Sequence, residues 1–194
     1  MADTALLVMD VQQVIVDIAD DGSGYLTRLR QAIDGAHAAG IPVIYVVIGL
    51  RPGQPEVSPH NRALTAAVEA GLFAEGDPGT EIHHDVAPQK GDIVVTKRRG
   101  SAFSGSDLDL VLRARGIDSL VLAGIATSGV VLYTLCQAND LDFGLTVLSD
   151  VCLDTDPEVH RFLTDKLFPQ WADVVAVEDW LKALAPGQEP VSEG

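Results

Sequence analysis

The chain has 194 residues, 47% of them hydrophobic, which is typical of one globular domain with a sizeable core. It carries 13 basic and 28 acidic residues, and its formal net charge of −15 argues against nucleic acid or an anionic membrane surface as a partner. Two cysteines, Cys136 and Cys152, are too few for a disulfide framework.

No apolar stretch is long enough to span a membrane. Residues 1–4 lead directly into a strand-like run and lack the basic and apolar regions of a signal peptide. We therefore expect a cytoplasmic protein with no membrane partner.

The first part of the chain is predicted to form a strand, a helix and a second strand. Residues 5–9 are a short apolar run ending at Asp10, which predicts a strand buried on both faces. Apolar residues recur at helical spacing over residues 26–36, and Gly40 and Pro42 end that helix. Residues 43–48 are a second apolar run, so the pattern is a βαβ unit.

A long Pro- and Gly-rich loop over residues 49–59 follows, which is expected to border a pocket. Residues 61–71 predict a helix and residues 75–91 an irregular polar segment. Within it, His83 and His84 are adjacent, so their side chains do not share a spacing that points both at one ion. No third ligand has a clear claim, and we expect no metal site.

Strands and helices alternate to the end of the chain. Further strands are predicted over residues 92–96, 117–123, 145–149 and 174–177. Ser106 is expected to cap one intervening helix, and Asp156 with Pro157 to open another. This order predicts a doubly wound six-stranded parallel sheet with helices on both faces, in one domain over residues 1–184. We expect the small polar tail over residues 185–194 to be disordered.

Chemistry-bearing residues follow three of the predicted strands. Asp10 ends the first, Lys97 follows the third, and the small-residue turn over residues 124–131 follows the fourth. In an open parallel sheet these ends border the ligand crevice. Asp10 could instead be a turn former, and Lys97 a solvated member of the basic run with Arg98 and Arg99. No dinucleotide or Walker-type glycine motif occurs, and we expect no cofactor.

Three segments together resemble the isochorismatase-like (cysteine hydrolase) superfamily. They are Ala5-Leu6-Leu7-Val8-Met9-Asp10-Val11-Gln12, Val94-Val95-Thr96-Lys97 with Ser101-Ala102-Phe103, and Val121-Leu122-Ala123-Gly124-Ile125-Ala126-Thr127-Ser128-Gly129-Val130-Val131. The likeness runs from about residue 4 to residue 182. It implies a Rossmann-like hydrolase fold with a small-molecule substrate, and a homodimer or higher homo-oligomer.

The resemblance also assigns roles to residues. It implies that Asp10 and Lys97 are catalytic, that the Ile125–Ala126 peptide bond is cis, and that the Ala126 and Val130 amides form an oxyanion hole. The nucleophile of the family is usually a cysteine, and its position here is Val130, whose side chain cannot attack a carbonyl carbon. We expect Gln12, Arg51, Phe103 and Thr127 to be substrate-binding residues.

Neither cysteine replaces that nucleophile in an obvious way. Cys136 is six residues beyond Val130, about 240° around a regular helix, and we expect it to be a buried structural thiol. Cys152, after the fifth predicted strand, is a slightly better candidate for the pocket. Which of Arg51, Arg98 and Arg99 face the pocket stays open at this point.

Three functions are compatible with the sequence. The first is a hydrolase without a cysteine nucleophile, in which Asp10 is the general acid, as in the branch of the family that cleaves a vinyl ether, and Lys97 holds a substrate carboxylate or orients Asp10. The second is a catalytically inactive relative that binds a small molecule or a protein. The third is an amidase-like hydrolase in which Asp10 activates water.

Overall fold

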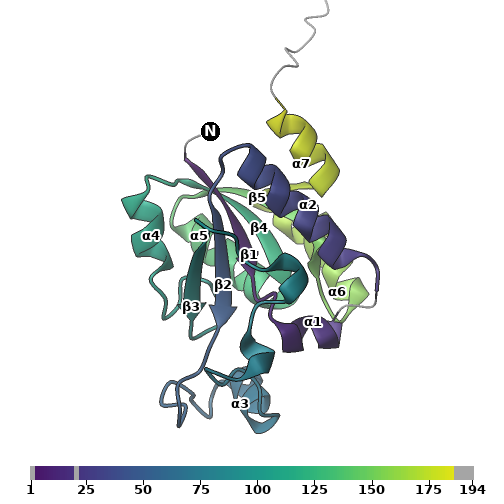
Figure 1. Ribbon diagram of the computed structural model, residues 1–194. Helices are drawn as coiled ribbons and strands as arrows, with labels where there is room; N and C mark the ends of the chain where they lie inside the picture. Colours follow the sequence, from purple (N-terminus) through teal and green to yellow (C-terminus); the bar gives the residue numbers. More distant parts are fainter. Residues whose placement is uncertain (1–2, 20–21, 186–194) are drawn as a thin grey trace, which may run out of the picture.

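The computed structural model describes residues 3–19 and 22–185 and contains a six-stranded, all-parallel sheet. The strand order is β3-β2-β1-β4-β5-β6, so the chain winds outward from β1 in both directions (Figure 1). The strands are β1 (Thr4–Met9), β2 (Val43–Ile48), β3 (Ile93–Lys97), β4 (Ser119–Ile125), β5 (Gly144–Leu153) and β6 (Asp173–Val175). The predicted doubly wound fold is confirmed.

Helices cover both faces of this sheet because its central strands are apolar on both sides. Leu6 and Val8 of β1 pack in the core under α2 (Tyr25–Ala38) and α7 (Val177–Leu184). Leu7 and Met9 point the opposite way, into the core under α4 (Leu108–Ala114) and α5 (Leu132–Asp140). The alternation along one strand therefore supplies two separate hydrophobic layers.

Three further α-helices belong to the fold: α1 (Gln13–Ala19), α3 (Arg62–Glu69) and α6 (Pro157–Phe162). The side chain of Asn61 caps α3. Asp156 caps α6 and Pro157 is the first residue of that helix, as predicted. Ser106 lies one residue outside the cap position of α4, and its hydroxyl accepts a hydrogen bond from the Leu108 amide.

Several bounds differ from the prediction. The sequence pattern did not indicate α1, and β5 continues to Leu153 instead of ending near residue 149. The irregular segment over residues 75–91 contains two 3₁₀ turns, Pro78–Thr80 and His84–Val86. A π-type turn, Thr127–Val131, separates β4 from α5.

Within residues 3–19 and 22–185, no helix combines the length and the apolar character needed to cross a membrane. The tail predicted to be disordered lies, from residue 186 onward, outside the described residues. The single domain over residues 1–184 and the homodimer stay predictions.

Candidate active site

The carboxyl ends of β1, β3 and β4 lie at one edge of the sheet. β1 is the strand from which the chain winds in both directions, and in such folds the crevice at this point receives ligands. In Figure 1 the arrow of β2 points toward α3, which lies beyond this edge. Asp10 follows β1, Lys97 ends β3, and the turn from Ile125 to Val130 follows β4.

Asp10 and Lys97 form a buried ion pair across the end of β2. Lys97 Nζ lies 2.9 Å from Asp10 Oδ2, and the two side chains are 1% and 9% exposed. Lys97 Nζ also donates to the Arg99 carbonyl oxygen at 2.8 Å. The other carboxylate oxygen, Asp10 Oδ1, is buried and has no hydrogen-bond partner among the described residues. A buried acceptor without a partner is rare and is typical of a place where water or a ligand binds.

The surroundings raise the pKa of the Asp10 carboxyl above its usual value. Burial is the largest cause, because a charged carboxylate is poorly solvated there, and the ammonium of Lys97 acts in the opposite direction. Asp10 is therefore a stronger base than an ordinary carboxylate, and its protonated form is a usable acid.

The turn after β4 is held close to β1 by a glycine. Gly124 has a φ of 156°, and a Cβ at this position would lie 2.4 Å from the Met9 carbonyl oxygen. The following peptide bond, Ile125–Ala126, is cis. Only glycine allows the two strand ends to approach this closely, so the turn lies directly beside Asp10.

Two side chains from the β5–α6 region hold the same turn. Thr127 Oγ1 lies 2.8 Å from His160 Nδ1, and the Ser128 amide donates to Asp154 Oδ2 at 2.7 Å. Sequence reasoning missed His160 and Asp154, because neither lies in a recognisable motif. Asp154 directly follows β5, but the predicted strand ended at residue 149, so the sequence did not mark this position as a strand end.

A cavity of about 810 Å³ opens at this edge, and Asp10 and Lys97 are part of its wall. Ile125, Ala126 and Val130 also line it. Val130 is 3% exposed and belongs to the core as well as to the cavity wall. Val130, to which the resemblance assigns the position of the nucleophile, therefore borders the cavity, but its side chain presents only methyl groups.

Both cysteine expectations are wrong. Cys136 is exposed and lines the cavity together with Val130, Tyr133 and Asp140, because a broad face of α5 borders the cavity and 240° in one direction around a helix is only about 120° in the other. Burial, aided by Asp140, raises the pKa of its thiol. Cys152 is buried beside β4, lies outside the cavity wall, and burial raises its thiol pKa to about 12. Both thiols are therefore protonated near neutral pH, which makes them poor nucleophiles.

The four residues expected to bind substrate lie outside the cavity wall. The side-chain amide of Gln12 is fully buried and bonds the main chain of Ile48 and Thr80, so it joins β2 to the 3₁₀ turn. The hydroxyl of Thr127 is hydrogen-bonded to His160, and the side chain of Arg51 is exposed.

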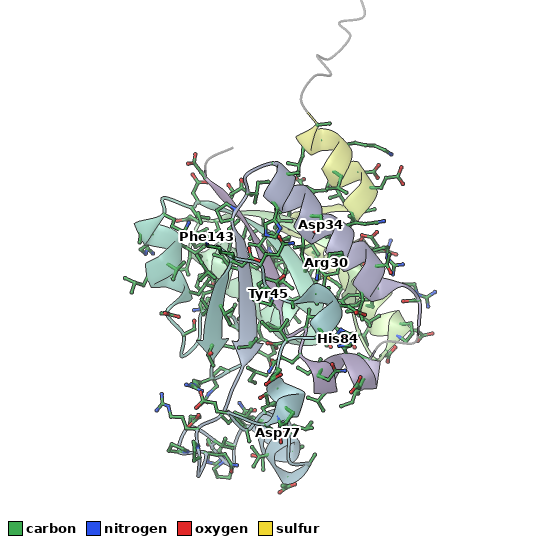
Figure 2. All side chains as sticks on the ribbon, in the orientation of Figure 1. Arg30, Asp34, Tyr45, Asp77, His84 and Phe143 are labelled. Carbon is green, nitrogen blue, oxygen red and sulfur yellow. The ribbon has the colours of Figure 1, made fainter. Side chains whose placement is uncertain are left out.

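Phe103 packs against Phe143, 5.8 Å away between ring centres. Figure 2 shows Phe143 toward the edge of the sheet opposite α3. Phe103 itself is a buried residue of the core. Of the three arginines considered, Arg99 alone lines the cavity; Arg98 bonds Glu75 and the Gly49 carbonyl instead.

His83, His84 and Asp85 bring three potential metal-ligand atoms within 4.8 Å of one another. His83 Nδ1, however, accepts a hydrogen bond from the Asp85 amide at 3.2 Å, so its lone pair is in use. The cluster lies outside the cavity wall. The expectation of no metal site stays a prediction.

Comparison with known proteins identifies the family of the chain. Residues 4–179 match the Isochorismatase domain family. The chain belongs to the isochorismatase family of hydrolases. The resemblance seen in the three sequence segments is thereby confirmed.

Relatives of this isochorismatase-family chain are hydrolases. It is 32% identical to ureidoacrylate amidohydrolase RutB of Pseudomonas syringae pv. syringae, over 97% of this chain and 86% of the relative. An isochorismatase family protein from Desulfovibrio vulgaris shares the fold with a TM-score of 0.82 and 26% identity, over 94% of this chain and 98% of that one. N-carbamoylsarcosine amidase from Thermoplasma acidophilum has a TM-score of 0.73 and 25% identity, over 91% and 97%.

Proposed function

We propose that this protein hydrolyses an amide-type bond in a small molecule, with water as the nucleophile and Asp10 as the group that moves the proton. The observation that carries the proposal is the unpartnered Oδ1 of Asp10, buried in the wall of a cavity that Val130 also lines. The names of the relatives, an amidohydrolase and an amidase, support a carbonyl substrate.

In the first step Asp10 Oδ1 takes a proton from water while the oxygen of that water bonds to the substrate carbonyl carbon. The carbonyl oxygen becomes an oxyanion. As the tetrahedral intermediate collapses, the carbon–nitrogen bond breaks and Asp10 returns its proton to the leaving nitrogen. The products are a carboxylic acid and an amine, and the carboxyl group of Asp10 ends as it began. A raised pKa suits both transfers.

Lys97 orients Asp10 in this scheme, because its ammonium group is fixed between Asp10 Oδ2 and the Arg99 carbonyl. The amides of Ala126 and Val130, two residues of the cavity wall, are assigned to the oxyanion. Val130 cannot form a covalent intermediate with the substrate, since its side chain has no lone pair.

A screen of small amides, ureas and vinyl ethers tests the proposal. For the substrate found, we expect Asp10→Asn to lower kcat/KM at least about a hundredfold, the lower range for a positioned acid–base group. Asp173→Asn, an exposed carboxylate at the start of the edge strand β6, is the matched control and should leave kcat/KM unchanged.

Iodoacetamide under native conditions should leave the activity largely intact. Inactivation that follows stoichiometric modification of Cys136, with protection by substrate, would contradict a water nucleophile. Turnover restricted to vinyl ethers would assign Asp10 to carbon protonation instead. No turnover in any of the three classes would favour a binding module.

A further inference from the structure

One cation of the cavity wall carries a charge that no acidic side chain balances. Among the described residues that line the cavity, the cations are Lys97 and Arg99. Lys97 forms the buried ion pair with Asp10. Arg99 forms no ion pair within the described part of the chain, whereas its neighbour Arg98 pairs with Glu75 outside the cavity wall. The wall therefore presents one uncompensated positive charge, on Arg99.

Two main-chain carbonyl groups hold the guanidinium of Arg99 in place. One terminal nitrogen donates to the Arg98 carbonyl oxygen at 2.8 Å, and the other donates to the Glu56 carbonyl oxygen. Both acceptors are neutral, so they fix the group without cancelling its charge. A guanidinium has more N–H groups than these two bonds use, and the others have no acceptor among the described residues. They are available to a ligand, and the fixed geometry lowers the entropy lost when the ligand binds.

Arg99 begins beside the carboxylate to which the proton transfer is assigned. Its own carbonyl oxygen accepts a hydrogen bond from Lys97 Nζ, the atom that is paired with Asp10. From there its side chain extends to Glu56, in the Pro- and Gly-rich loop that follows β2. A ligand with its carbonyl group at Asp10 can therefore place the other end of the molecule at Arg99.

The exposed acidic residue of the wall belongs to another part of it. A Cβ at Gly100 would lie 3.0 Å from the ring of Tyr133, so the residue next to Arg99 packs against that ring. Asp140 is the last residue of α5, about 10 Å further along the helix axis than Tyr133, and it is exposed to solvent. The net charge of −15 opposes anions in general, so binding one requires a local cation such as Arg99.

We propose that Arg99 anchors an anionic group of the substrate, and that the substrate class is an amide that carries one carboxylate. A planar carboxylate accepts two parallel N–H bonds from a guanidinium. The single uncompensated charge favours a monoanion, because a phosphate dianion needs a second cation. Leu72 and Phe73, in the same wall, accommodate the apolar body of such a molecule. The inference rests on the proposed amide hydrolysis and specifies its substrate.

Ketones that resemble the substrate but have no bond to hydrolyse test the anchor. They are acetophenone and its meta- and para-carboxylates, which place the anion at two distances from the carbonyl group. Calorimetric titration of the wild-type protein keeps the Asp10–Lys97 pair intact. We expect one of the two carboxylates to bind at least about tenfold more tightly than acetophenone, the lower range for hydrogen bonds to a charged group. The para-phosphate of acetophenone should bind less tightly than that carboxylate.

Variants of Arg99 separate its charge from its structural role. Arg99→Gln removes the charge and keeps the main-chain carbonyl that holds Lys97. It should weaken binding of the carboxylate at least about tenfold and leave acetophenone within about twofold, whereas a purely structural role would weaken both alike. Arg99→Lys should retain part of the preference, because the charge remains but the planar fork is lost. Arg113→Gln removes an exposed arginine outside the cavity wall and should change neither affinity.

Carboxylates that fail to bind, or bind no more tightly than acetophenone, would overturn the inference, as would a preference that Arg99→Gln leaves unchanged. A phosphate that binds more tightly than both carboxylates would overturn the choice of a monoanion. If a carboxylate binds through Arg99 but the corresponding carboxamide is not hydrolysed, the proposed hydrolysis fails and the anchor stands. If that carboxamide is hydrolysed with a kcat/KM that Arg99→Gln does not lower, the anchor fails and the hydrolysis stands.

Discussion

Removing Lys97 should destabilise this protein far more than removing Lys97 and Asp10 together. At 2.9 Å their attraction is about 6 kcal/mol for an effective dielectric constant of about 20, but burying each ion costs several kcal/mol. The raised pKa of Asp10 shows that burial outweighs the attraction on the carboxylate. We expect Lys97→Met and Asp10→Asn each to lower the free energy of unfolding by about 3–5 kcal/mol, because each leaves one partner buried alone.

The double variant should lie within about 1–2 kcal/mol of the wild-type protein or above it, since a neutral pair needs no solvation. Urea unfolding at pH 7 measures all four proteins, and Lys182→Met, which removes exposed contacts with Glu178 and Asp179, is the control and should change the stability little. A double variant that loses the sum of the two single effects would refute the reasoning.

The Lys97→Met variant also has a predictable pH dependence. Without the ammonium, nothing opposes the effect of burial, and the pKa of Asp10 in the folded state lies further above its unfolded value. The folded state then binds more protons than the unfolded state, so stability is greatest at low pH and falls as pH rises through the folded pKa. The difference from the wild-type protein should therefore shrink as the pH is lowered from 7 toward 5.

Two further predictions concern the turn after β4. Gly124→Ala should lower the free energy of unfolding by at least about 2 kcal/mol, because its Cβ would meet the Met9 carbonyl oxygen, and urea unfolding of the variant beside the wild-type protein checks this. Burial lowers the pKa of His160, so its contribution to stability is complete above the unfolded pKa of about 6.5 and is lost as pH falls below it. A pH series of unfolding free energies should show this loss, and His160→Gln should remove it; an unchanged series in His160→Gln would contradict it.

The sheet could be predicted from sequence because six apolar runs of strand length alternate with helical patterns. The first helix could not, because the chain turns at Asp10 with a φ of 56° and no glycine or proline marks the break. The predicted strand ends were sufficient to identify Asp10, Lys97 and the turn after β4 as candidate site residues. The residues that α1 and α3 contribute to the cavity wall could not be predicted, because tertiary packing sets the positions of these two helices.

The position of Cys136 shows the same limit in another form. The helical angle separates it from Val130 by about 120°, but the width of the cavity, which brings both residues into one wall, depends on how α5 packs against the rest of the fold. Likewise, His160 and Asp154 reach the turn only because α6 folds back against it. Contacts of this kind have no pattern in the local sequence.

Hydrolysis with water as the nucleophile needs no covalent bond between substrate and protein. Intact-protein mass spectrometry after acid quench during steady-state turnover tests it most directly, with the substrate identified in the screen. We predict that the protein keeps its unmodified mass at every time point while product accumulates. A stoichiometric acyl adduct on Cys136 that forms and decays at the rate of turnover would contradict the account.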